Sequence, residues 1–126
     1  MLKFPYINKL REEGYLSIPF NLLVVNFLFQ RIFGINRFVP FSTHYTSCVD
    51  GAQNLKIGRR VHVSFAVSGG CYISATNGLE IGDDSLFAPN VVIQSLNHDL
   101  YLREIPTREQ PVRIGRNCWI GANVVI

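Results

Sequence analysis

The sequence predicts an all-β solenoid, and two observations lead to this prediction. Residues 81–98 divide into three six-residue units, and each unit begins with a large apolar residue: Ile81, Phe87 and Ile93. The same unit returns from Ile114 to the end of the chain. A period of six fits neither an amphipathic helix nor a long alternating strand, but it fits short strands joined by tight turns. Hexapeptide repeats are typical of a parallel β-helix, in which neighbouring coils stack on one another.

The composition indicates one folded domain with a substantial core. The chain has 126 residues, of which 48% are hydrophobic and 17% charged, so we do not expect disorder. The net charge of +3 lies in the first forty residues. It forms no dense basic stripe, and we expect no nucleic-acid binding. Three cysteines without metal-ligand spacing are typical of reduced thiols, which predicts a cytoplasmic protein.

Residues 1–37 are expected to form an N-terminal arm with one helix, at about residues 18–33. The run from Asn21 to Phe33 is apolar on most faces, and Gly34 is a natural stop. This helix is too short and too polar to span a bilayer. In one interpretation, this helix packs on the β-helix or on a neighbouring subunit. In the other, it lies on the inner face of the membrane as a peripheral contact, because the arm carries both an apolar run and the excess positive charge.

Residues 38–126 are expected to form the β-helix domain. Residues 38–48 have the composition of an extended segment that leads into the first coil, and residues 57–68 read as the first two units of the repeat. Glycines such as Gly58 and Gly82 take the second place of several units. A tight turn there needs a small residue or one with positive φ.

Interruptions of the repeat predict a loop and an open end. Three units make one coil, so residues 81–98 are expected to form one full turn. The interval from Ile93 to Ile114 is not a multiple of six, and residues 99–113 are therefore expected to protrude as a loop. The chain stops at Ile126, at the start of a unit. We expect the β-helix to be incomplete at this end, or a partner to cover it.

Two stretches carry a specific resemblance to a known family. They are the units of residues 81–98 with the Asn97-His98-Asp99 junction, and the string PVRIGRNCWIGANVVI at residues 111–126. With the protruding loop, they resemble the hexapeptide-repeat acyltransferases, and most closely the maltose, galactoside and polysaccharide O-acetyltransferases. The resemblance implies a left-handed parallel β-helix, a homotrimer with active sites between subunits, and acetyl-CoA as acyl donor. The implied acceptor is a hydroxyl of a small sugar, a lipid-linked sugar or another polysaccharide precursor.

His98 matches the catalytic histidine of that family. A hydroxyl is a poor nucleophile at neutral pH and needs a base to take its proton, and imidazole titrates in the right range. The second ring nitrogen needs a partner that holds it. Asp99, Glu104 or a backbone carbonyl could be that partner, and Asp99 fits equally well as a plain turn residue.

Four further residues are candidates for binding, and Trp119, Ala122 and Ser68 match positions of the family. Trp119 matches a tryptophan on the acetyl-CoA side, although an outward tryptophan also suits a subunit interface. Ala122 matches a position whose backbone N–H contacts the donor. On the acceptor side, Asn97 and Ser68 are candidates for substrate binding, and each also fits as a corner residue of its unit.

Three other functions are compatible with the same fold. A metalloenzyme resembling the γ-class carbonic anhydrases needs three histidine ligands, and the spacing of His44, His62 and His98 does not match that pattern. We therefore expect no metal. The second is a non-catalytic trimeric scaffold or degenerate paralogue. The third is an acetyltransferase with a non-sugar acceptor such as serine.

Overall fold

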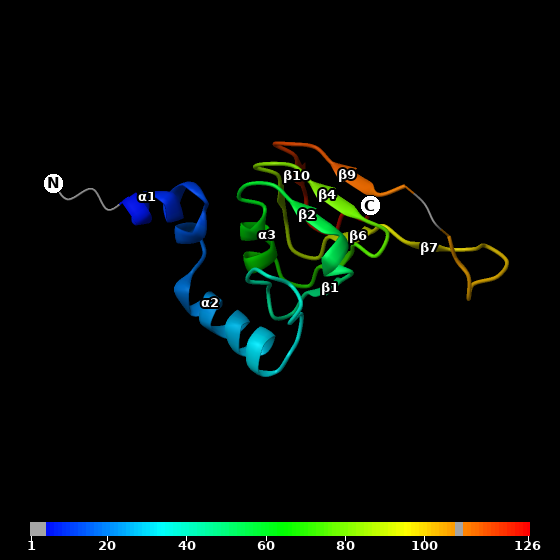
Figure 1. Cartoon of the computed structure of the whole chain (residues 1–126), viewed down its shortest axis with the longest axis horizontal. Helices are drawn as coiled ribbons and strands as arrows, with labels where there is room; N and C mark the ends of the chain where they lie inside the picture. Colours follow the sequence, from blue (N-terminus) through cyan, green and yellow to red (C-terminus); the bar gives the residue numbers. More distant parts are fainter. Residues whose placement is uncertain (1–4, 108–109) are drawn as a thin grey trace.

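The structure is a computed structural model that describes residues 5–107 and 110–126 (Figure 1). Residues 108 and 109 of the predicted loop lie outside the described residues. Short helices dominate the N-terminal part: α1 (Pro5–Glu12), η1 (Tyr15–Ser17), α2 (Phe20–Phe27) and the π-helical η2 (Leu28–Ile32). Two more short helices follow, η3 (Ala52–Asn54) and α3 (His62–Val67). The remainder consists mainly of strands of two or three residues and turns.

The strands form three small parallel sheets and one antiparallel pair. The first sheet has the order β1-β3-β6, the second β2-β4-β9 and the third β5-β10, and β7 pairs with β8. Their bounds are β1 (Cys48–Asp50), β2 (Leu55–Ile57), β3 (Tyr72–Ser74), β4 (Leu79–Ile81), β5 (Leu86–Phe87), β6 (Val92–Gln94), β7 (Asn97–His98), β8 (Pro106–Thr107), β9 (Val112–Ile114) and β10 (Trp119–Ile120).

The chain visits the three parallel sheets in turn. Strands β4, β5 and β6 follow one another in sequence and belong to the second, third and first sheets. Residues 81–98 therefore pass through each sheet once, which is the path predicted for one coil. The fold is β-helix-like: small parallel sheets predominate and helices are few.

Stacked apolar residues between these sheets form the core. In the first sheet, Val49 pairs with Ile73 and Ile73 with Ile93, and all three are buried. The second and third sheets add buried Leu79, Ile81, Phe87 and Ile120 to the same cluster. Each short strand thus places an apolar side chain inward, which explains why the apolar residue recurs every six positions.

The corners use two residue types for two different reasons. A Cβ atom on Gly82 would lie 2.7 Å from the carbonyl carbon of Gly115 in the next coil, so glycine is needed there for close approach. Positive φ angles fall two places later, at Asp84 (59°), Asn90 (62°), Asn117 (54°) and Asn123 (63°), and also at Arg60 (66°), two places after Gly58. Asp and Asn tolerate this conformation better than other non-glycine residues.

The prediction that residues 57–68 form two hexapeptide units is wrong in its second half. Residues 62–67 form α3, which lies below β5 at the place where a third strand of that sheet would pair. The hydroxyl of Ser64 accepts a hydrogen bond from the N–H of Phe87 (3.1 Å), and the hydroxyl of Ser68 donates to the carbonyl of Phe87 (2.7 Å). Side chains of α3 and of the adjacent Ser68 therefore form hydrogen bonds with the backbone groups at the edge of β5. A strand of a further coil would otherwise form these bonds.

The arm contains more helix than expected. The helix predicted at about residues 18–33 is observed as α2 followed by η2. The sequence analysis missed α1 and η1, which precede it. Figure 1 shows the arm on one side of the coils and the β7–β8 hairpin protruding on the other. Within the described residues, no helix has the length and apolar character needed to cross a membrane.

Candidate functional site

His98 lies at the base of a hairpin that leaves the coil between two sheets. The hairpin is inserted after β6 of the first sheet and before β9 of the second. Asn97 pairs with Thr107 and His98 with Pro106 across its two short strands. Ile81 and Ile114 stack although they are 33 residues apart, because one coil of 18 residues is extended by the 15 residues of the loop. The repeat arithmetic thus accounts for both the coil and the predicted protrusion.

The His98 side chain is open to solvent. It is exposed, and its backbone N–H donates to Oδ1 of its neighbour Asn97 at 2.9 Å. Within residues 5–107 and 110–126, no side chain or backbone group hydrogen-bonds the imidazole. Both ring nitrogens are therefore accessible to a ligand. The Asn97 side chain is also exposed, and it lies next to His98 on the same strand.

Asp99 holds the hairpin turn. Its Oδ1 accepts hydrogen bonds from the N–H groups of Tyr101 (2.8 Å) and Leu102 (2.9 Å). These two bonds lower the pKa of the Asp99 carboxyl, with the Leu102 bond contributing most. Of the two roles left open for Asp99, a hydrogen bond to the His98 imidazole is not formed within the described residues. The structure instead shows the alternative role of a turn residue.

Ser68 lies inside the molecule. It is 3% exposed, and its hydroxyl donates to the Phe87 carbonyl. Its own carbonyl accepts from the hydroxyl of Ser47 at 3.0 Å. The structure therefore does not bring Ser68 together with His98 at a surface that an acceptor could reach.

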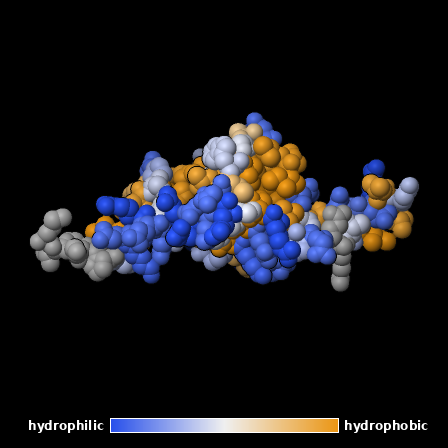
Figure 2. All heavy atoms as spheres, turned by 90° about the horizontal axis from the view of Figure 1, so that it is seen from above, coloured by the Kyte–Doolittle hydropathy of each residue, from blue (hydrophilic) through white to orange (hydrophobic). Residues whose placement is uncertain are grey.

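Trp119 and Ala122 lie on and just after β10, in the third sheet. Trp119 is 69% exposed and pairs with Leu86, which is 41% exposed. The backbone N–H of the exposed Ala122 donates no hydrogen bond to a described residue, so a ligand carbonyl could accept from it. Seen from above, hydrophobic side chains form a broad area over the coils (Figure 2). An exposed indole and an open N–H donor are groups that can contact a ligand carrying amides.

One chain does not bring His98 and Trp119 together. His98 follows the first sheet at its corner with the second sheet, whereas Trp119 belongs to the third sheet. In the closed three-sided coil that the sequence predicts, that corner would lie opposite the third sheet.

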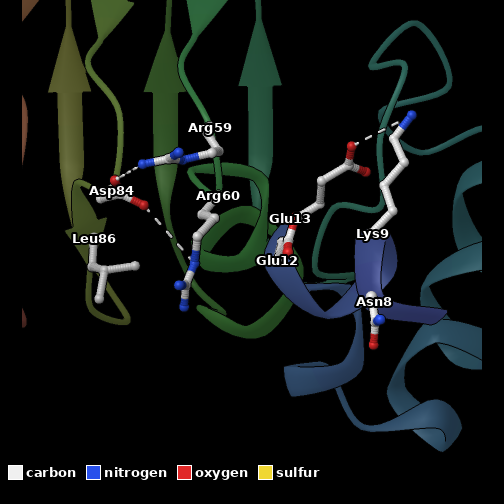
Figure 3. A pocket seen from close by; sticks show the side chains of 8 residues that line it. All are labelled: Asn8, Lys9, Glu12, Glu13, Arg59, Arg60, Asp84 and Leu86. Carbon is white, nitrogen blue, oxygen red and sulfur yellow. Dashed lines mark hydrogen bonds and ion pairs between the residues drawn. The ribbon is translucent and has the colours of Figure 1, made fainter. Parts of the chain in front are cut away.

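A charged hollow of about 1070 Å³ lies between α1 and the coils (Figure 3), and it was not predicted from the sequence. Arg59 and Arg60 project into it and contact Asp84 at 2.7 Å and 3.9 Å. On the arm side, Lys9 and Glu13 are 3.9 Å apart. The 24-residue register that places residue 60 beside residue 84 would have revealed this cluster, but only β2–β4 pairing discloses that register.

The three histidines have separate surroundings. His44 contacts Thr46 through Nδ1, and His62 stacks on Tyr15 with ring centroids 4.4 Å apart. Burial lowers the pKa of both His44 and His62. Across the described residues, no group of three or more His, Cys, Asp and Glu side chains is placed to hold a metal ion.

Comparison with known proteins finds one informative similarity. The chain is 34% identical over 77 residues to galactoside O-acetyltransferase of Escherichia coli (strain K12), which covers 59% of this chain and 36% of that protein. The chain thus spans little more than a third of the length of this relative. No protein-family model matches the chain. No solved structure matches it either.

Proposed function

We propose that the chain belongs to an acetyl-CoA-dependent O-acetyltransferase of the hexapeptide-repeat type, with a hydroxyl of a sugar or polysaccharide precursor as acceptor. The observation that carries this proposal is the 34% identity to galactoside O-acetyltransferase. Support comes from an accessible His98 at the base of a protruding hairpin on a β-helix-like fold. The arm (residues 1–37), the left-handed β-helix domain (residues 38–126) and a cytoplasmic location are parts of the same proposal.

His98 acts as the general base. Acetyl-CoA supplies the acetyl group as a thioester. The imidazole of His98 takes the proton of the acceptor hydroxyl as the hydroxyl oxygen attacks, and then gives it to the departing sulfur. Asn97 lies next to His98 on the same strand, and its exposed amide binds the acceptor. Within the chain itself, nothing holds the second ring nitrogen of His98, so substrate or a neighbouring subunit provides that contact.

The active site lies between subunits of a homotrimer. Trp119 and the N–H of Ala122 bind the donor on one subunit, and His98 reaches it from the next. Topology supports this arrangement, because His98 follows the first sheet, whereas Trp119 belongs to the third sheet. The exposed Trp119 and Leu86 also supply apolar surface that a neighbouring subunit or the donor would cover.

Turnover of acetyl-CoA tests the proposal. Thiol release is measured with the protein from the complete reading frame that contains this chain, with a panel of sugars and lipid-linked sugars. Loss of a general base lowers rates by about 10²–10⁴, so we expect His98→Ala to lose that much with the preferred acceptor. The matched control is His44→Gln, which changes a histidine outside the site and should keep the wild-type rate. An unchanged rate in His98→Ala would show that His98 is not the base, and no turnover with any acceptor would favour the non-catalytic scaffold.

A further inference from the structure

The helices of the arm pack with their polar side inward. Asn26 is fully buried and Gln30 is 3% exposed, although both lie in an otherwise apolar run. The Asn26 amide donates to the carbonyl of Ala66 in α3 at 3.0 Å. The Gln30 amide donates to the carbonyl of Val39 at 2.9 Å and accepts from the N–H of Thr43 at 3.2 Å. Because these buried amides are satisfied only in this orientation, they fix which face of α2 and η2 meets the coil domain.

The opposite face of the same helices is apolar and exposed. We call it the arm face, and it consists of Phe20, Val24, Phe27, Leu28 and Ile32. The five side chains recur at helical spacing over 13 residues, or about 20 Å of helix. A surface helix of a globular protein normally turns such a stripe towards the core. An exposed apolar stripe of this kind marks an interaction surface.

Positive charge accompanies the arm face without acidic partners. Residues 14–49 contain Arg31 and Arg37 and no Asp or Glu. The Arg31 guanidinium donates to the carbonyls of Arg37 (2.7 Å) and Val39 (3.0 Å), and Arg37 lies 4.7 Å over the ring of the exposed Phe38. Among the described residues, neither arginine forms an ion pair with a carboxylate. By contrast, Lys9, Lys56, Arg59, Arg60 and Arg113 all do.

A hollow beside the helix lies next to one of these charges. Its volume is about 270 Å³, and it is lined by Leu23, Phe27, Gln30, Arg31, Pro40, Phe41 and Ser42. Most of this lining is apolar. A guanidinium with spare N–H donors beside an apolar hollow suits a molecule that carries both a phosphate and hydrocarbon.

We propose that the arm face binds the surface of a bilayer that contains anionic lipids. Its apolar side chains enter the boundary between headgroups and acyl chains, and Arg31 and Arg37 contact lipid phosphates. Two observations favour this occupant. Neither arginine has a carboxylate partner among the described residues, which suits an anionic surface, and exposed apolar side chains lie on the same helices, which suits hydrocarbon. A contact with a second copy of the chain is the other outcome that the test below distinguishes. The proposal does not depend on the acetyltransferase activity.

Vesicle co-sedimentation tests the proposal. The complete protein is mixed with vesicles of phosphatidylcholine alone, or with phosphatidylglycerol added at about a third of the lipid. We expect binding to the anionic vesicles that weakens in high salt, and little binding to the neutral ones. The variant Phe20→Gln/Phe27→Gln/Ile32→Gln should reduce the partition coefficient at least tenfold. Arg31→Gln/Arg37→Gln should remove the preference for anionic vesicles.

The matched control changes exposed apolar residues away from the arm. Leu100→Gln/Tyr101→Gln/Leu102→Gln alters three residues of the hairpin tip and should bind vesicles as the wild type does. Light scattering and circular dichroism of each variant verify its mass and folding. Equal binding by the arm-face variant and the wild type would overturn the proposal. The proposal would also be overturned if the wild type bound neither type of vesicle and the arm-face variant formed a smaller oligomer. The arm face would then be a contact between copies of the chain.

Discussion

Asp99 and His98 are neighbours in sequence but have different tasks in the structure. The Asp99 carboxylate accepts two backbone hydrogen bonds inside the hairpin turn, whereas no group of the described residues hydrogen-bonds the His98 ring. Asp99 thus stabilises the conformation of the loop, whereas the proposed chemistry at the base of the loop falls to His98. Both roles of Asp99 were open in the sequence. An acidic residue directly after a histidine can orient the imidazole, or it can stabilise a turn by accepting backbone hydrogen bonds.

The role of Asp99 leads to a prediction about two substitutions. Asp99→Asn keeps an oxygen acceptor for the N–H groups of Tyr101 and Leu102, so we expect it to retain most of the acetyl-transfer rate. Asp99→Ala removes that acceptor, loosens the hairpin and lowers the rate, chiefly through a higher KM for the acceptor. Steady-state kinetics of both variants check this. A loss of kcat in Asp99→Asn as large as that in His98→Ala would instead show that the carboxylate charge serves the imidazole directly.

Ser68 lies in the unit where the repeat prediction is wrong. The sequence predicts a corner residue of a hexapeptide unit or a contact with the acceptor. The structure places it at the end of α3, with its hydroxyl on the carbonyl of Phe87. The i, i+4 spacing of Val61 and Phe65, both buried, also fits a helix. Only the contact with the distant β5 decides between the two patterns.

At the scale of elements, α3 stabilises the edge of the third sheet. Ser68→Ala leaves the buried Phe87 carbonyl without its donor, and we expect the free energy of unfolding to fall by about 1–3 kcal/mol. The KM for the acceptor should not change. Denaturant unfolding and kinetics of the same variant measure both quantities. Gln53→Ala, which shortens an exposed side chain without a hydrogen bond to the described residues, serves as control with a change within about 0.5 kcal/mol. An unchanged free energy of unfolding combined with a raised KM for the acceptor would instead show that Ser68 contacts the acceptor.

The coils and the main helical segment of the arm were predictable from the sequence, but the orientation of that helical segment was not. A six-residue period is a direct consequence of short strands and corners, so residues 81–98 and the insertion at residues 99–113 follow from counting. The orientation of α2 and η2 does not follow from hydropathy, because burial favours the apolar face and here the buried residues are Asn26 and Gln30. Specific hydrogen bonds to distant backbone groups determine that orientation.

At the scale of the whole molecule, we propose that the site is completed by two chains. His98 follows the first sheet, whereas Trp119 belongs to the third sheet. Under this proposal, each chain contributes His98 to one site and Trp119 to another. The likeness to galactoside O-acetyltransferase over 77 residues suggests the chemistry, and the topology suggests how copies of the chain share it.

Complementation between two inactive variants tests this claim most directly. His98→Ala and Trp119→Ala are purified separately, then unfolded and refolded together in equal amounts, and acetyl-CoA turnover is measured. In random mixed trimers, about one quarter of the sites combine an intact His98 from one chain with an intact Trp119 from its neighbour. We therefore predict that the mixture recovers about a quarter of the activity of refolded wild type. Activity no higher than the average of the two variants alone would contradict a site shared between chains.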